Sequence, residues 1–198
     1  MSTPSLFDGV VNSNGILMIA FGPIFLAFIP VTNYITTPNS LVQKAIETLL
    51  AAIPGSASIP SNRVIPALSA FYIFWTFAAT GAASAAGLGA SRKEGLDNSH
   101  PRKDISALRG LPLRLRSAHY NTMEMFPIKG FALAAALAQI TAPTNQNLIN
   151  LLGLHVLLKT FIYYPAYILD IAPLRSLAHL GATASVINVA WQVATGAK

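Results

Sequence analysis

The chain has 198 residues, of which 53% are hydrophobic and only 10% are charged, and its mean hydropathy is +0.52. Soluble domains usually carry about 25% charged residues, so this composition argues against a soluble protein and for an integral membrane protein. The net charge of +6 comes from basic residues that gather between apolar runs, which favours membrane topology over nucleic-acid binding. Because there is no cysteine, disulfides, a thiolate nucleophile and cysteine-ligated metal are excluded.

Residues 1–62 are predicted to form an N-terminal extension that begins with an apolar helix over about 15–34. A membrane span needs about 20 residues, and this stretch is long enough. Gly22 and Pro23 are expected to bend it. We favour a span, and a re-entrant or interfacial helix also fits the bend.

The extension continues with an amphipathic helix over about 40–53. Its apolar residues fall on one face, Asn39 or Ser40 can cap its start, and Pro54 ends it. This pattern predicts a helix that lies on the membrane surface or against the other helices.

Residues 63–198 are predicted to form an all-α transmembrane bundle of four helices. Its spans are expected at about 64–88, 115–142, 147–169 and 174–195. In the first span, Gly81, Ala85 and Gly89 are spaced by four, and small residues on one stripe let helix backbones approach closely in lipid.

Basic residues concentrate in and around the loop between the first two spans: Arg92, Lys93, Arg102, Lys103, Arg109, Arg114 and Arg116. The positive-inside rule places this loop in the cytosol. The turn that joins the last two spans is then also cytosolic.

The second span begins with a polar face. Arg114, Ser117, Asn121 and Glu124 fall within an arc of roughly 80° when residues are plotted at 100° each. A carboxylate inside the membrane costs on the order of 2–3 kcal/mol, so Glu124 is expected to be ionised and to face Arg114 or a bound ammonium group.

The last two spans bring further polar groups to the same depth. A stripe spaced by four runs along the third span: His155, Lys159, Tyr163 and Tyr167. Pro165 is expected to kink this span, and Arg175 and Ser176 open the fourth. This convergence predicts a site, although interhelical bonding, interfacial aromatics and topology would each explain single residues.

Two stretches of the chain resemble the signatures of the MAPEG superfamily, the membrane-associated proteins of eicosanoid and glutathione metabolism. The first carries Asn98, Pro101, Arg102, Leu108, Gly110, Arg114, Ala118, His119, Asn121, Glu124, Phe126 and Pro127. The second carries Tyr163, Tyr167, Arg175 and Ser176. The resemblance covers about Val64 to the C-terminus.

The resemblance implies a homotrimer of four-helix subunits that binds glutathione between subunits near the cytosolic face and takes a lipophilic substrate from the bilayer. It implies catalytic roles for Arg175, Tyr163 and Tyr167, with Arg175 stabilising the thiolate. The expected glutathione-binding residues are Arg114, Asn121, Glu124, Lys159 and Ser176. No metal is expected, and the membrane is expected to be the endoplasmic reticulum or another intracellular membrane.

The chain departs from the mammalian members at two cationic positions, where Ser117 and Thr160 replace arginines. The leading hypothesis is a glutathione-dependent transferase or isomerase. Two alternatives stay open: an enzyme of secondary metabolism that uses Glu124, the tyrosines or His119 for acid–base chemistry without glutathione, and a non-catalytic membrane scaffold.

Overall fold

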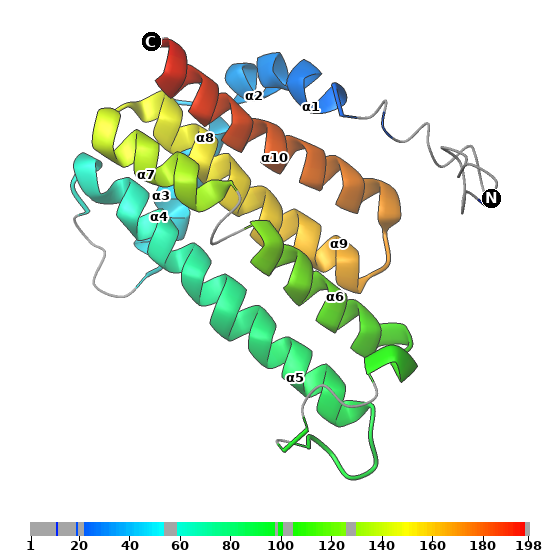
Figure 1. The fold of residues 1–198 in the computed structure, drawn as a ribbon. Helices are drawn as coiled ribbons and strands as arrows, with labels where there is room; N and C mark the ends of the chain where they lie inside the picture. The colour runs from blue at the N-terminus through cyan, green and yellow to red at the C-terminus, as the bar shows by residue number, and fades with distance from the viewer. Residues whose placement is uncertain are drawn as a thin grey trace, which may run out of the picture.

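The computed structural model is helical, with no strand among the residues it describes. These are residues 11, 19, 22–53, 59–97, 99–100, 105–125 and 130–196. The longest helices run side by side along one axis (Figure 1). Two continuous helical stretches, Ser61–Ala90 and Gln146–Ile168, are long and apolar enough to cross a membrane, and Ile24–Ile35 and Phe131–Thr141 are shorter apolar helices. The expected all-α, membrane-type fold is therefore confirmed at this level.

The first long stretch packs closely against the helix that follows it. It consists of η2 (Ser61–Arg63), α4 (Val64–Ile73), a π-helical segment η3 (Phe74–Ala79) and α5 (Thr80–Ala90), and α5 contacts α6 (Gly110–Met125). A Cβ at Gly87 would lie 3.1 Å from Cδ1 of Leu115 and 3.3 Å from Cα of Pro112. Gly81 of the predicted small-residue stripe faces the His119 ring. Small residues thus serve close packing within the chain.

Two helices occupy the stretch expected to hold one span over 115–142. The first is α6, and the second is α7 (Phe131–Thr141). Gly130 has φ −175° and ψ −71°, so α7 begins anew at Phe131. Residues 126–129, which include part of the family-like motif, lie outside the described residues.

The next long stretch contains the expected irregularity at its proline. It comprises α8 (Gln146–Leu157), a π-helical segment η5 (Leu158–Tyr163) and α9 (Tyr164–Ile168). Because Pro165 has no N–H to donate, the preceding turn widens, and the N–H of Tyr164 donates to the carbonyl of Lys159 five residues back. The last helix, α10 (Ala172–Thr195), ends at Gly196, whose φ is +63°.

The extension forms α1 (Ile24–Ala27), α2 (Ile29–Ile35) and α3 (Leu41–Ala51). Helices α1 and α2 lie along α10 (Figure 1). Of the apolar helix expected over 15–34, the structure describes the part after Gly22 and Pro23, and residues 12–18, 20 and 21 lie outside the described residues.

Hydrogen bonds from amide side chains on α8 and α10 join α2 to these helices. Nδ2 of Asn188 donates to Oγ1 of Thr32 at 3.0 Å and to Oδ1 of Asn33 at 2.7 Å, and Nε2 of Gln192 donates to the same Asn33 oxygen at 3.0 Å. Nδ2 of Asn150 donates to the carbonyl of Thr36 at 2.9 Å. In lipid, interhelical hydrogen bonds of this kind hold helices together, each contributing about 0.6–2 kcal/mol.

The predicted amphipathic helix is present and docks on α8. Oγ of Ser40 accepts from the N–H of Gln43 at 3.4 Å, so Ser40 is the N-cap. Ile46 is only 2% exposed, and its side chain lies on the bare backbone of Gly153. A Cβ at Gly153 would overlap the Ile46 side chain.

We therefore predict that Gly153→Ala destabilises the protein. Alanine favours a helix over glycine by about 1 kcal/mol, whereas forcing a methyl group into a packed contact costs about 1–3 kcal/mol, so the clash wins. Thermal unfolding in detergent should show a lower midpoint. Gly153→Ala should lower the midpoint less when it is introduced into an Ile46→Ala chain, because the smaller side chain leaves room for the methyl group. Gly89→Ala, where a Cβ has ordinary contacts from 3.6 Å, is the matched control. A Gly153→Ala protein more stable than the wild type would contradict this packing.

Candidate functional site

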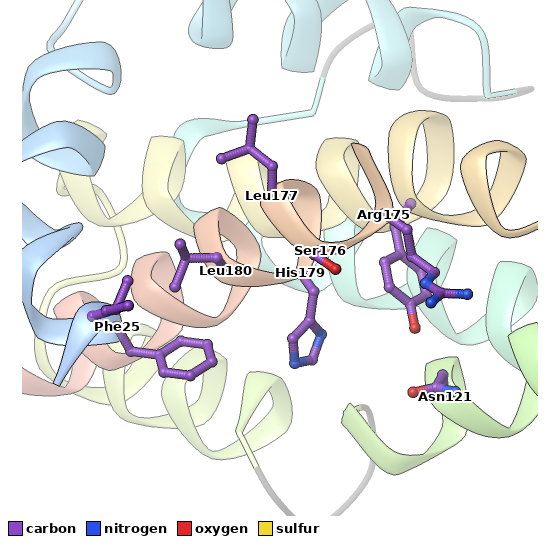
Figure 2. Close-up of a pocket in the computed structure, with 9 residues that line it drawn as sticks. Phe25, Asn121, Arg175, Ser176, Leu177, His179 and Leu180 are labelled. Atoms are coloured by element: carbon purple, nitrogen blue, oxygen red, sulfur yellow. The ribbon is translucent and has the colours of Figure 1, made fainter. Parts of the chain in front are cut away.

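A pocket of about 510 Å³ opens where α1, α6, η5 and α10 meet. Its polar residues are Asn121, Tyr163, Arg175, Ser176 and His179, and its apolar residues are Ile24, Phe25, Leu177 and Leu180. Figure 2 shows the His179 ring pointing into the space between Phe25 on one side and Asn121 and Arg175 on the other. The pocket thus has one polar end and one apolar end.

Four of the eight predicted site residues line this pocket: Asn121, Tyr163, Arg175 and Ser176. Tyr167 lies directly behind them, because its ring is 5.8 Å from that of Tyr163 and 4.6 Å from Cζ of Arg175. The stack on Tyr167 holds the Arg175 guanidinium in place through a cation–π contact. Residues predicted from three spans are therefore brought together.

Lys159 reaches the pocket only through its neighbours. Its side chain is fully buried, with Nζ 2.9 Å from Nδ1 of His179 and 3.9 Å from the ring centroid of Tyr163. Lys159, predicted to bind glutathione, thus lies behind the pocket and contacts two residues that line it, His179 and Tyr163.

Glu124 is exposed on α6 and interacts electrostatically with Lys159 and Tyr163. The predicted pair with Arg114 is wrong. Nε of Arg114 donates to the carbonyl of Ile168 at 2.9 Å, and its Nη1 lies 4.0 Å from Oδ2 of Asp170. The two residues share a helix face but are ten positions apart, which separates them by about 15 Å along the axis.

Two other histidines, His119 on α6 and His155 on α8, bond to neighbouring helices. Nδ1 of His119 lies 2.8 Å from Oγ1 of Thr80 on α5. His155 is fully buried, with Nδ1 2.8 Å from the carbonyl of Ala182 and Nε2 3.2 Å from the hydroxyl of Tyr72. Both lie outside the set that lines the pocket.

Sequence reasoning missed His179 and Phe25, whose rings form a T-shaped contact with centroids 6.2 Å apart. The spacing of His179 offered a signal, since it follows Arg175 by one helical turn and therefore shares its face. Phe25 offered none, because its place depends on how α1 docks on α10.

The family model described as MAPEG family matches residues 65–195, about two thirds of the chain. The chain belongs to the MAPEG family. This is a family of membrane proteins that includes glutathione transferases and isomerases as well as other members. Neither a search of curated proteins nor a search of solved structures found a match.

The MAPEG region supplies the polar residues of the pocket, while Ile24 and Phe25 come from the extension outside it. The described residues contain no group of three or more histidine, aspartate or glutamate side chains that could hold a metal ion. The chemistry available in the described pocket is therefore that of a fixed guanidinium, a phenol, an amide, a hydroxyl and an imidazole.

Arg114 is expected to stabilise the fold of this MAPEG protein. Arg114→Met removes its hydrogen bond to the end of α9 and its ion pair with Asp170, and the half-exposed position limits the loss to about 1 kcal/mol. Thermal unfolding in detergent should show a lower midpoint. Arg116→Met, which removes a contact to exposed Tyr120, is the control and should change the midpoint less. Equal midpoints for wild type and Arg114→Met would refute this role.

Proposed function

We propose that this MAPEG protein is a four-helix transmembrane subunit of a homotrimer that uses glutathione to conjugate or isomerise a lipophilic electrophile. The observation that carries the proposal is the pocket in which Arg175 and Phe25 face the same space. A charged tripeptide and an apolar reaction partner need such adjoining polar and apolar ends.

The polar end of the pocket matches the chemistry of glutathione, which has two carboxylates, an ammonium group and a thiol. Arg175 offers a permanent cation and Asn121 an amide, and Glu124 lies exposed on the same helix as Asn121. Glu124 can pair with the ammonium group, and the guanidinium can pair with a carboxylate or lower the pKa of the bound thiol.

The apolar end suits a partner that arrives from the bilayer. Phe25, Leu177 and Leu180 line it, and Leu177 is 55% exposed, so this part of the pocket continues to the protein surface. A lipophilic molecule dissolved in the membrane can reach this surface without crossing water.

The basic loop before α6 supports an orientation with this end in the cytosol. The hydrogen bond from Arg114 to Ile168 brings the start of α6 next to the turn between α9 and α10. We place the protein in an intracellular membrane, with the site towards its cytosolic side.

An enzyme that works by acid–base chemistry without glutathione is the second candidate. The observation that favours it is the loss of two cationic positions. Thr160 is buried with no hydrogen-bond partner for its Oγ1 among the described residues, and the carbonyl of Ser117 accepts from Nδ2 of Asn121 at 3.1 Å. Neither residue supplies a charge to a carboxylate.

Calorimetry on detergent-solubilised protein should show glutathione binding, and Glu124→Gln should weaken it more than tenfold while the protein still folds. The substitution keeps the shape of the side chain but removes the charge that pairs with the ammonium group. Glu124 is exposed on the single subunit, and the proposed trimer would cover the pair, for which losing one partner costs about 2–5 kcal/mol. Glu94→Gln, in the loop after α5, is the control. Absence of wild-type binding would favour the acid–base enzyme or a non-catalytic scaffold.

Arg175 is expected to lower the pKa of the bound thiol. Ultraviolet difference titration of bound glutathione should show the apparent thiol pKa rise by about one unit in Arg175→Leu, equivalent to about 1.4 kcal/mol. Arg175→Lys keeps the positive charge and should retain most of the effect. If the leucine variant leaves the thiol pKa unchanged, Arg175 marks the cytosolic end of α10 and does not activate sulfur.

A further inference from the structure

A buried ammonium group and an imidazole form a pair that no part of the proposed glutathione site uses. Nζ of Lys159 lies 2.9 Å from Nδ1 of His179, and the Lys159 side chain has no exposed surface. His179 lines the pocket, whereas Lys159 sits behind it. The pair joins η5 to α10, two segments already brought together by their packing.

Two contacts of Lys159 stabilise its charged form and act against burial, which opposes it. Nζ lies 3.9 Å from the ring centroid of Tyr163, in a cation–π position, and it is attracted electrostatically by Glu124. An ammonium group has three donor hydrogens and no acceptor, so Nδ1 of His179 must accept this hydrogen bond.

This bond fixes the tautomer of His179. An imidazole that accepts at Nδ1 is neutral and carries its proton on Nε2. Around the ring, Tyr163 packs with centroids 5.9 Å apart, Phe25 has no polar atom, and His155 bonds to Ala182 and Tyr72. The hydroxyl of Ser176 and the amide of Asn121 line the same pocket. Arg175, four residues before His179, is itself only a donor.

The geometry points to His179 as a catalytic residue whose Nε2–H donates to an oxygen atom of the lipophilic substrate, with Lys159 as the positioning residue that fixes its tautomer. The ring enters the pocket beside Phe25, at the junction of its polar and apolar ends (Figure 2). A donor at this junction suits an apolar molecule that carries an oxygen acceptor. This inference rests on the proposed function for the identity of the nucleophile.

An α,β-unsaturated carbonyl compound fits this arrangement. The thiolate sulfur forms a bond to the β-carbon, the electron pair of the C=C bond moves to form the enolate, and the C=O pair moves to oxygen. The enolate oxygen accepts the hydrogen bond from Nε2 of His179, and water then protonates the α-carbon. The reaction adds a thiol across a double bond with no net oxidation. A donor already aimed at the developing charge needs no rearrangement when the charge forms.

The tautomer is tested first, without any ligand, by nitrogen-15 NMR of protein labelled at its four histidines. His179→Gln identifies the His179 signals by their loss. Wild-type protein is expected to show His179 protonated on Nε2 alone, and Lys159→Met to show both tautomers. Protonation of Nδ1 in the wild type overturns the inference, whether or not Lys159→Met folds.

Kinetics with two electrophiles of similar size then test the donor. His179→Leu should lower kcat/KM for the glutathione conjugation of trans-2-nonenal by about 100-fold, as expected when one such donor is lost. It should change the reaction of 1-iodohexane, which has no oxygen, far less. His179→Gln keeps a donor at a similar reach and should recover much of the nonenal activity. Equal losses for both electrophiles, or none, overturn the assignment.

A third measurement separates this inference from the proposed function. Addition of 2-nonanone, an unreactive ketone, should shift the Nε2 signal of His179, whereas nonane should not. If the wild type fails to bind glutathione but shows this shift, glutathione is not the nucleophile and the assignment of His179 as the oxygen donor stands. If glutathione binds but the ketone produces no shift, the assignment of His179 as the oxygen donor is wrong and the proposed function stands.

Discussion

The ammonium group of Lys159 is the charge around which the polar interior is arranged. A cation inside a membrane protein is costly unless its neighbours satisfy it, and here two of these neighbours come from other helices and one from η5 itself. His179 on α10 accepts its hydrogen bond, Tyr163 offers the face of its ring, and Glu124 on α6 supplies opposite charge. Satisfying one buried cation therefore also orients two pocket residues, His179 and Tyr163.

The same constraint explains how the extension is attached. In lipid the hydrophobic effect contributes little to the association of two helices, so hydrogen bonds and close packing must hold them together. The amides of Asn188 and Gln192 donate hydrogen bonds to Asn33, and the Ile46 side chain packs against the backbone of Gly153. These contacts are far from the chemistry, yet they place α1 and hence the apolar wall of the pocket.

Patterns within one helix were readable from the sequence. Ser40 as a cap and an irregularity at Pro165 each follow from the local sequence. The convergence of Asn121, Tyr163 and Arg175 was predicted by combining the patterns of three spans. Helical spacing also placed Arg114 and Glu124 on one face, but the predicted pair between them does not form. A helical projection gives the direction of a side chain but not its position along the helix axis. The new start of α7 after Gly130 was not predicted, although Pro127 and Gly130 are both residues that disfavour a helix interior.

The sequence by itself determined that the chain is helical, suited to a membrane and polar at one depth, because length, apolar content and helical period are properties of short segments. Only the tertiary structure decided that Nδ1 of His179 meets Lys159 and that His179 lines the pocket, because both depend on how different helices pack. It also decided that Phe25 closes a pocket shared with Asn121, Tyr163 and Arg175. These residues lie roughly 100 to 150 positions from it, and no local pattern records contacts over such separations.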